Sequence, residues 1–319
     1  MSEKKEEAVY SNPNGMPMAQ GKNLHMDLGP GDISNRIVTV GTASRAEKIA
    51  SYFDNADKPE ADGGPKRIQS GRGFLTITGT FEGIPCSVVA IGMGPSMMDF
   101  FVRETRAVVE GPIVACRFGT CGGITSEALV GSVVVASEGS AYVTRNPDAF
   151  TYRYNSTDST EAKDAPGDKY NMYEICPSDP TLSAMVKSNL EEILVNDKEL
   201  NNDSQMGNDT SRWVAEGANV TAESFYSSQG RIDPQFDDSN EDLIEQITSK
   251  YPNARTMEME TFLLFHLAKS CKVPIYASAA AIVVANRDNN STVDSSKLER
   301  VEALGGKAVL QAVCRMPMP

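Results

Sequence analysis

The sequence is poor in the residues on which metal centres and nucleic-acid surfaces depend. Its 319 residues include only two histidines and one tryptophan, and 43 acidic side chains outnumber 30 basic ones. A formal charge of −13 excludes a general surface for nucleic acids or anionic membranes, because both require an excess of Lys and Arg. Two histidines are too few for an ordinary histidine-based metal site. In so acidic a chain, an arginine within a motif indicates a nearby ligand or partner that requires positive charge.

Long apolar runs and paired cysteine motifs are also missing. No run has the length of a membrane span, and residues 1–22 lack the apolar core of a signal peptide. We therefore expect a flexible polar tail over residues 1–22 and a cytoplasmic protein. The six cysteines form no Cys-x-x-Cys pair and lie mostly in apolar segments, so we expect reduced core thiols.

Beyond residue 22, short β-branched runs alternate with segments of helical period. We expect strands within residues 36–41, 74–92 (two strands with a turn at 81–83), 111–119, 131–139, 214–225 and 273–286. We expect helices within residues 42–53, with Ser44 as N-cap, and 94–109, 178–194, 259–271 and 295–313. The alternation predicts an α/β fold, a single domain with a central mixed β-sheet flanked by helices.

Two polar stretches interrupt this pattern near residues 151–170 and 196–213. Both are rich in Asn, Asp, Ser and Gly, and the alternation of strands and helices resumes after each. They are therefore predicted to be surface insertions in one domain over residues 23–319 rather than linkers. In the apolar helix 259–271, His266 is expected to be a core or interface residue and not a catalytic one.

Three expected strand ends carry glycine together with a hydroxyl or an arginine: "VGTASR", "IGMGPS" and "RFGTCGG". Backbone N–H groups at such turns bind anions, and arginine adds a bidentate fork suited to phosphate. An unpaired guanidinium is costly to bury, so Arg117 in the third motif favours an anionic ligand. None of the three matches GxxxxGK[ST] or GxGxxG, and each alone is more typical of a tight turn than of an anion site.

Two further segments carry side chains suited to a nucleoside. In "SFYSSQGRID", Gln229 and Arg231 can face a planar ring with adjacent carbonyl and N–H groups, while Phe225 stacks nearby. In "TMEMET", Glu258 and Glu260 can accept the protons of sugar hydroxyls. Alone, the first also fits a polar surface loop, and the second fits first-turn acids favoured by a helix dipole.

The order of these segments resembles the nucleoside phosphorylase superfamily, uridine phosphorylase type. The resemblance is carried by "NLHMDL", "VGTASR", "GRGF", "IGMGPS", "RFGTCGG", "SFYSSQGRID", "MEMET" and "VVANR". It runs from His25 to the C-terminal helix and skips the two polar stretches. It implies a nucleoside phosphorylase-like fold and the reversible, phosphate-dependent cleavage of uridine to uracil and ribose 1-phosphate in pyrimidine salvage.

The resemblance also implies the site residues. Phosphate is bound by the positions matching Gly41, Arg45, Arg117 and Thr120, and by Arg72 of a neighbouring subunit. The base is read by Phe225, Gln229 and Arg231. The ribose is held by Glu258, Met259 and Glu260, and by the neighbour's His25. The residues implied to carry the catalysis are Arg117, Arg231 and Glu260. The resemblance therefore implies a homodimer with shared active sites.

The implied chemistry is electrostatic. Positive charge develops on the ribose and negative charge on the departing base, so phosphate stabilises the first and Arg231 with Gln229 stabilises the second. Inorganic phosphate is the co-substrate, and no metal, nicotinamide or covalent enzyme intermediate is required. The expected partners are small molecules and a second subunit, without nucleic acid or membrane.

Some positions depart from the family pattern or leave a different activity open. Ala43 stands where relatives often carry proline, which affects the rigidity of the first loop. Gly73 stands where some relatives hold a monovalent cation through an acid, so a structural cation at the dimer interface stays open. Asp288 keeps open a purine nucleoside phosphorylase of the same fold, in which an Asp after the last long strand acts on purine N7. A hydrolytic nucleosidase and a non-catalytic nucleoside-binding relative also stay open.

Overall fold

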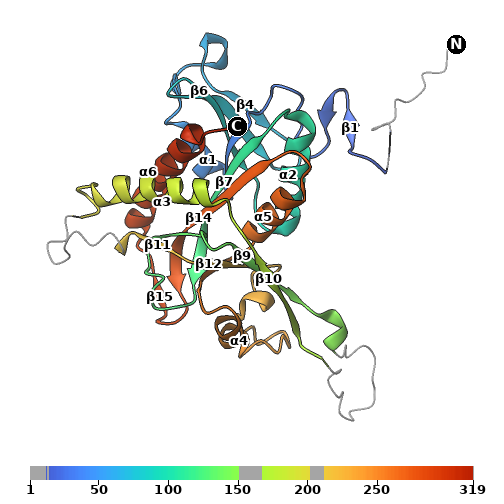
Figure 1. The fold of residues 1–319 in the computed structure, drawn as a ribbon, viewed down its shortest axis with the longest axis vertical. Helices are drawn as coiled ribbons and strands as arrows, with labels where there is room; N and C mark the ends of the chain where they lie inside the picture. The colour runs from blue at the N-terminus through green and yellow to red at the C-terminus, as the bar shows by residue number, and fades with distance from the viewer. Residues whose placement is uncertain (1–11, 13, 151–166, 202–211, 319) are drawn as a thin grey trace.

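The structure is a computed structural model that describes residues 12, 14–150, 167–201 and 212–318. In these residues a central sheet is covered by helices on both faces (Figure 1). Most of the predicted tail and of the two predicted insertions falls outside the described residues. At the end of the predicted tail, β1 (Met18–Ala19) pairs antiparallel with β2 (Lys22–Asn23), so this segment has regular structure that was not expected.

The described part of the main sheet has thirteen strands. They are β3 (Arg36–Val40), β4 (Lys66–Gln69), β5 (Leu75–Phe81), β6 (Ile84–Ala90), β7 (Ile113–Gly123), β8 (Val133–Val135), β9 (Ser140–Arg145), β10 (Tyr170–Cys176), β11 (Val214–Glu216), β12 (Ala218–Ala222), β13 (Ala254–Glu258), β14 (Ile275–Asn286) and β15 (Ser291–Thr292). Strand β3 lies parallel to β6 and β7, and β14 lies parallel to β7, whereas β5 and β6 are antiparallel. The prediction of a mixed sheet is confirmed.

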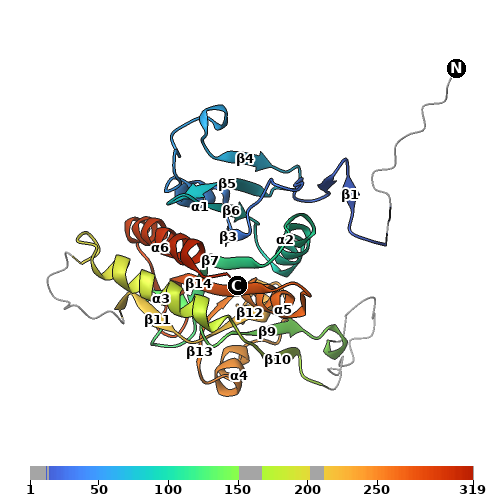
Figure 2. The ribbon, with the colours of Figure 1, turned by 45° about the horizontal axis from the view of Figure 1, so that its top comes forward.

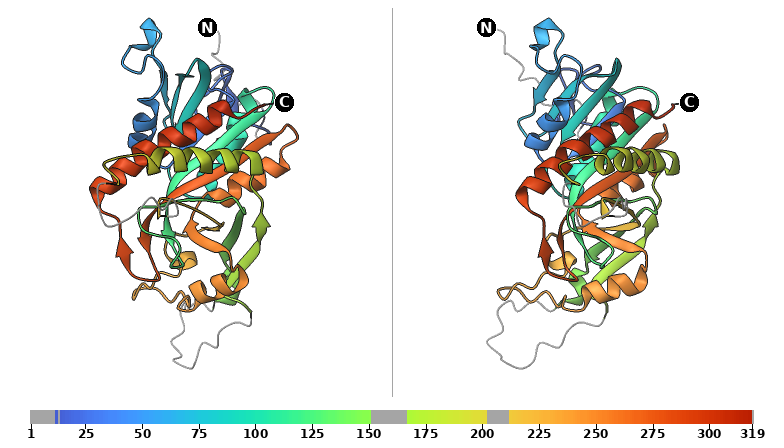
Figure 3. Two further views of the ribbon diagram at one scale, coloured as in Figure 1. Left: turned by 60° about the vertical axis from the view of Figure 1, so that its left-hand side comes forward. Right: turned by 90° about the vertical axis from the view of Figure 1, so that its left-hand side faces the viewer.

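Helices cover both faces of this sheet (Figures 2 and 3). They are α1 (Ala43–Ala50), α2 (Pro95–Val108), α3 (Pro180–Val195), α4 (Leu243–Lys250), α5 (Thr261–Ser270) and α6 (Ser295–Arg315). Helices α1, α3 and α6 pack with one apolar cluster of the sheet, and α2 and α5 pack with another. On β3, Val38 belongs to the first cluster and Ile37 to the second, so this strand is buried on both faces. This double burial explains the continuous apolar runs of the parallel strands.

Two adjacent glycines allow α6 to approach the sheet closely. A Cβ atom on Gly305 would lie 2.7 Å from the ring of Phe118 in β7, and one on Gly306 would lie 2.6 Å from Ile49 in α1. Glycine weakens a helix interior, but here it leaves room for these two side chains. The packing holds α6 against α1, next to the end of β3.

Several expected boundaries are wrong. The N-cap of α1 is Thr42 and not Ser44, because Thr42 Oγ1 accepts a hydrogen bond from the backbone N–H of Arg45. Strand β7 does not end near Arg117 but continues to Gly123, because β14 pairs with it along its whole length. The single strand expected over 214–225 is two strands, since β11 pairs with β8 whereas β12 pairs with β9 and β13. The strands β1, β2, β4, β9, β10, β13 and β15 and the helix α4 were not expected.

The cysteines and His266 differ in how far they match expectation. All six cysteines are free, and four of them are buried: Cys86, Cys116, Cys121 and Cys314. Reduced core thiols are thus confirmed for these four. His266 is exposed and stacks on the ring of Phe262 with a centroid distance of 5.7 Å. It is therefore not a core residue, and its assignment to an interface stays a prediction. No helix in the described part of the chain is long and apolar enough to span a bilayer.

Candidate active site

A cavity of about 330 Å³ lies at the edge of the sheet where the parallel strands β3, β6, β7 and β14 end. Ligands of open α/β sheets commonly bind at this edge. Its lining residues are Gly41, Thr42, Arg45, Met93, Arg117, Thr120, Cys121, Gly122, Phe225, Gln229, Arg231, Met257, Glu258, Met259, Glu260, Val284, Ala285 and Arg287. All predicted site residues are among them except His25 and Arg72.

Arg117 is buried between two carboxylates. Its Nε lies 3.2 Å from Oε2 of Glu258, and its Nη2 donates to Oε2 of Glu260. All three side chains are no more than 7 % exposed. The remaining nitrogen, Nη1, is buried without a hydrogen-bond partner among the described residues. Arg117 therefore neutralises part of the acidic cluster and still has donors for a further acceptor.

The two carboxylates differ in protonation behaviour. Burial opposes ionisation of Glu258, but the charge of Arg117 and a hydrogen bond from Thr221 hold its pKa below the usual value. Burial raises the pKa of Glu260, and the nearby charge of Glu258 adds to this effect. Glu258 is thus the ionised member of the pair, and Glu260 takes up a proton more readily.

The surrounding hydrogen bonds explain how Glu258 is held. Its Oε1 accepts from Asn219 Nδ2 and from Thr221 Oγ1, both at 2.7 Å, and its Oε2 accepts from the backbone N–H of Glu260 at 2.9 Å. Both oxygens already have protein donors, so Glu258 anchors the start of α5. Glu260 accepts from the backbone N–H of Gly94 at 2.5 Å, which connects the "IGMGPS" loop to the cluster.

Gly119 has a steric role next to this cluster. A Cβ atom at Gly119 would lie 1.5 Å from Nη1 of Arg117, so any side chain would displace the guanidinium. The glycine of "RFGTCGG" therefore gives Arg117 room beside the strand and does not form a loop. Arg117 was expected to need an anionic ligand as its partner, but its partners in the structure are carboxylates of the same chain.

Arg45 brings a second guanidinium to the cavity from the first turn of α1. Its Nε and Nη2 donate to Oε1 of Glu302 at 3.1 and 2.7 Å. Lys48 Nζ donates to Oε2 of the same carboxylate at 2.8 Å. Burial would raise the pKa of Glu302, but the hydrogen bonds from Lys48 and Arg45 outweigh it and keep that pKa below its usual value.

The loop after β12 gathers the side chains predicted to read a base. Arg231 lies over the ring of Phe225, with 3.7 Å from its Cζ to the ring centroid. Its Nη1 donates to Oε1 of Gln229 at 2.5 Å. Burial lowers the pKa of Arg231, and the neighbouring charge of Arg287 lowers it further. The amide and the guanidinium are thus adjacent, as the Gln-x-Arg spacing predicts.

Arg287 was missed as a site residue although it ends the motif "VVANR". Its Nη1 and Nη2 donate to the backbone carbonyls of Gln229 and Gly230 at 2.6 and 2.7 Å. It therefore fixes the loop after β12 to the end of β14.

The next residue, Asp288, is exposed and does not line the cavity. Asn286 Nδ2 donates to the carbonyls of Thr125 and Ala128, both at 2.8 Å, so its amide has a structural role.

His25 and Arg72 lie away from the cavity of their own chain. His25 Nδ1 contacts Oε1 of Glu104 at 2.5 Å, and its ring stacks on Phe100. Arg72 lies in a turn whose backbone N–H groups bond Ser70 Oγ. Their predicted service to a neighbouring subunit stays a prediction.

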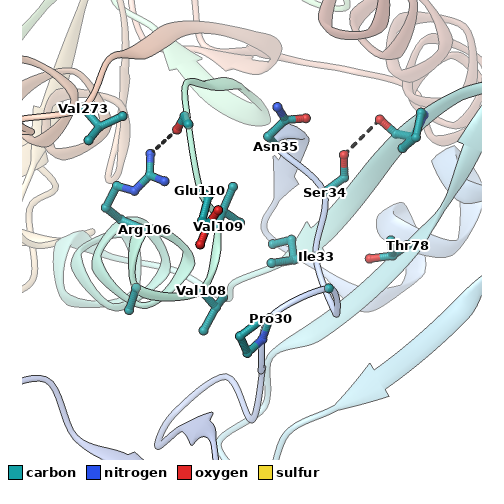
Figure 4. A pocket seen from close by; sticks show the side chains of 14 residues that line it. Pro30, Ile33, Ser34, Asn35, Thr78, Arg106, Val108, Val109, Glu110 and Val273 are labelled. Carbon is teal, nitrogen blue, oxygen red and sulfur yellow. Dashed lines mark hydrogen bonds between the residues drawn. The ribbon is translucent and has the colours of Figure 1, made fainter.

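A larger hollow of about 820 Å³ lies at the opposite ends of β3, β6 and β7 (Figure 4). Two of its polar side chains already have partners in the fold. Arg106 Nη1 donates to the carbonyl of Gly111, and Ser34 Oγ donates to that of Pro85. The hollow therefore offers less chemistry than the smaller cavity. Within the described ranges, no three His, Cys, Asp or Glu side chains are grouped to hold a metal ion.

The chain was compared with known protein families. A family model described as the phosphorylase superfamily matches residues 35–316. The chain belongs to this family. The resemblance predicted from the sequence is thereby confirmed, and the observed sheet and helices agree with the predicted nucleoside phosphorylase fold.

Curated relatives of this chain align over shorter segments. A uridine phosphorylase of Treponema pallidum is 31 % identical over 113 residues, 35 % of this chain and 40 % of the relative. A DeoD-type purine nucleoside phosphorylase of Geobacillus is 30 % identical over 131 residues, 41 % of this chain and 51 % of the relative. The alignments thus span about half or less of these curated relatives.

A solved structure from a study of two uridine phosphorylases of the oomycete Phytophthora capsici is similar to almost the whole of this chain. It is 42 % identical with a TM-score of 0.87, and the match covers 97 % of this chain and 100 % of that one. A nucleoside phosphorylase of Trypanosoma brucei has a TM-score of 0.70 at 19 % identity over 94 % of this chain and 99 % of that one, which shows the same fold.

Proposed function

We propose that this phosphorylase is a uridine phosphorylase, which cleaves uridine reversibly to uracil and ribose 1-phosphate with inorganic phosphate as co-substrate. The observation that carries this proposal is that one cavity is lined both by groups that can bind an anion and by groups that can bind a base. Arg45 and Arg117 supply donors for an anion, and Gln229 with Arg231 supplies a planar donor and acceptor set. The similarity to the Phytophthora capsici structure over the whole chain supports it.

In the proposed reaction a phosphate oxygen bonds to C1′ of the ribose. The electron pair of the C1′–N1 bond leaves with uracil, which takes a proton from solvent. Negative charge on the departing base is stabilised by Arg231 and Gln229, and positive charge on the ribose is stabilised by phosphate. Glu260 accepts hydrogen bonds from the ribose hydroxyls, which keep their protons. Arg117 is paired with Glu260 and donates to the anion through its remaining N–H groups. No resident metal or organic cofactor takes part in these steps.

The purine reading has less support from the cavity. Purine relatives match part of the sequence. However, Asp288 is exposed, and the amide of Asn286 is bound to two carbonyls of the β7–β8 segment. Neither side chain is among those that line the cavity. An acid for purine N7 is therefore missing from the described lining, and uridine is the better substrate.

The proposed working unit is a homodimer in the cytoplasm. Arg72 and His25 lie outside their own cavity, and in the proposed dimer they reach the phosphate and ribose of the neighbour's site. Free cysteines suit a reducing compartment. The position at which some relatives recruit a cation is Gly73, and a structural cation at the interface of the proposed dimer stays open.

The deciding experiment is an assay of uridine and inosine with and without inorganic phosphate, in buffer treated with a chelator. We expect uridine cleavage only with phosphate, and ribose 1-phosphate as the product. Equal cleavage without phosphate would make the protein a nucleosidase. Faster cleavage of inosine would make it a purine phosphorylase, and no cleavage of either would favour a binding protein.

A further inference from the structure

Glu302 of α6 contacts Arg45, which lines the cavity, but does not line the cavity itself. It is 257 residues from Arg45 in the chain, and α6 carries it to the first turn of α1. The side chain of Glu302 is 14 % exposed and that of Arg45 is 9 % exposed. The contact is therefore a largely desolvated ion pair, in which geometry is better defined than in a surface pair.

The geometry of this pair leaves one side of the guanidinium open. A guanidinium has five N–H donors in a fixed plane. Glu302 Oε1 accepts from Nε and Nη2, which lie on the same side of the fork. The donors of Nη1 have no partner among the described residues, and one N–H of Nη2 is left beside them. This pair of donors, one from each terminal nitrogen, is the set that binds an oxyanion in bidentate fashion.

We propose that Glu302 is a positioning residue for phosphate: it holds the plane of Arg45 so that the Nη1–Nη2 edge is presented to the anion. The inference rests on the proposed function, since it assumes that the anion in the cavity is phosphate. Glu302 acts through Arg45 and does not touch the substrate.

Lys48 explains how a carboxylate can be tolerated so near an anion. Its Nζ lies 2.8 Å from the second oxygen of Glu302. Arg45, Lys48 and Glu302 together carry one net positive charge, so the cluster still attracts a dianion. The Lys48 side chain is 32 % exposed, and solvent weakens its long-range effect on the cavity. Removing Lys48 leaves the contact between Glu302 and Arg45 intact, which makes it a suitable control.

The test is calorimetric titration of inorganic phosphate into wild type, Glu302→Met, Glu302→Gln and Lys48→Met. Methionine fills similar space but accepts no strong hydrogen bond, whereas the glutamine carbonyl oxygen can still accept from Arg45. We expect the Kd for phosphate to rise about tenfold in Glu302→Met, because Arg45 is then no longer held in the orientation that makes a charge-assisted contact with phosphate. Smaller changes, about threefold or less, are expected in Glu302→Gln and Lys48→Met.

Steady-state kinetics give the second readout. In Glu302→Met, the KM for phosphate should rise with the phosphate Kd, while the KM for uridine stays the same. If Glu302 only ties α6 to α1, the unfolding temperature falls and the phosphate Kd does not change, which overturns the proposal. Tighter phosphate binding in Glu302→Met would overturn it as well, because the carboxylate would then compete with the anion. If Glu302→Met does not fold, Glu302→Ala, which lets water solvate Arg45, takes its place with the same expectations.

The wild-type titration separates this inference from the proposed function. If the wild type binds phosphate and the variants bind it with the same Kd, only the role of Glu302 is overturned and the proposed function stands. A wild type that binds no phosphate overturns both.

Discussion

Nδ1 of His25 lies 2.5 Å from Oε1 of Glu104, a carboxylate that is 2 % exposed. The same carboxylate accepts hydrogen bonds from the backbone N–H groups of His25 and Met26. Because Glu104 is an acceptor, we assign a proton to Nδ1, and Nε2 has no partner among the described residues. Stacking on Phe100 at 4.1 Å fixes the ring plane. α2 therefore holds His25 in a defined orientation, with one nitrogen available to another molecule.

Replacing Glu104 by Met, which fills similar space but accepts no strong hydrogen bond from Nδ1, should reduce the proposed contact of His25 with the ribose 5′-hydroxyl in the neighbouring site. We expect kcat/KM for uridine to fall roughly tenfold, as for the loss of one well-oriented hydrogen bond. The same variant should cleave 5′-deoxyuridine at the wild-type rate, because this substrate lacks the hydroxyl. His25→Ala should behave in the same way. An equal loss with both substrates would mean that Glu104 only stabilises the residue 23–28 turn.

Gly119→Ala is expected to disrupt the centre of the site. The added Cβ would lie 1.5 Å from Nη1 of Arg117, so the guanidinium must move and leave two buried carboxylates without their counter-charge. Breaking a buried ion pair costs about 3–5 kcal/mol of unfolding free energy. Urea denaturation checks this. Gly122→Ala in the same strand is the control for stability, because its nearest neighbour would lie at 3.9 Å. Equal midpoints for the two variants would contradict the proposed steric role of Gly119.

Much of the fold follows from the sequence because it depends on local patterns. The apolar runs of β3 and β14 and the caps of α3 can be recognised within a few residues, since Asp179 accepts from Leu182 N and is followed by Pro180. The chain order of the motifs also predicts most of the cavity lining. By contrast, short strands such as β9 and β13 have no apolar period long enough to distinguish them from loops.

The electrostatic partners could not be predicted, because they depend on contacts between distant residues. Arg117 looked unpaired, since its carboxylate partners lie more than 140 residues later, and this is why β7 was expected to end near it. The pairing of Arg45 with Glu302 likewise depends on how α6 packs against α1. No local rule assigns Glu302 a role, because its helix position is that of an ordinary polar residue.

The stability contributed by Glu302 should depend on pH. Burial opposes ionisation of Glu302, but hydrogen bonds from Lys48 and Arg45 keep its folded-state pKa below the usual 4.5. A lowered pKa contributes stability that is present above 4.5 and is lost as the pH falls through the folded-state value. We expect Glu302→Gln to be less stable than wild type at pH 7, with a difference that narrows below 4.5.

Urea midpoints measured from pH 7 down to pH 3 check this expectation. This is roughly the range in which paired carboxylates become protonated and their ion pairs are lost. Glu245→Gln, on an exposed position of α4, removes the same charge and controls for net charge. A difference between wild type and Glu302→Gln that stays constant through this range would show that the carboxylate charge does not stabilise the fold.

Subunit complementation tests whether Arg72 serves the neighbouring site. Arg72→Ala and Arg231→Ala should each be nearly inactive, because every site in either homodimer lacks one arginine. After the two variants are mixed, unfolded and refolded, a heterodimer has one site with both arginines and one with neither. Random pairing makes about half of the dimers hetero, so activity should recover to roughly a quarter of wild type.

A mixture of Arg231→Ala and Gln229→Ala is the matched control. Both residues line the cavity of their own chain, so each site of that heterodimer keeps one defect and activity should not recover. Recovery in the first mixture alone would locate Arg72 in the opposite site, because only residues from different subunits can be restored by pairing. If neither mixture recovers, and the refolded protein is mixed and dimeric, then Arg72 does not act across the interface and each subunit completes its phosphate site with its own Arg45 and Arg117.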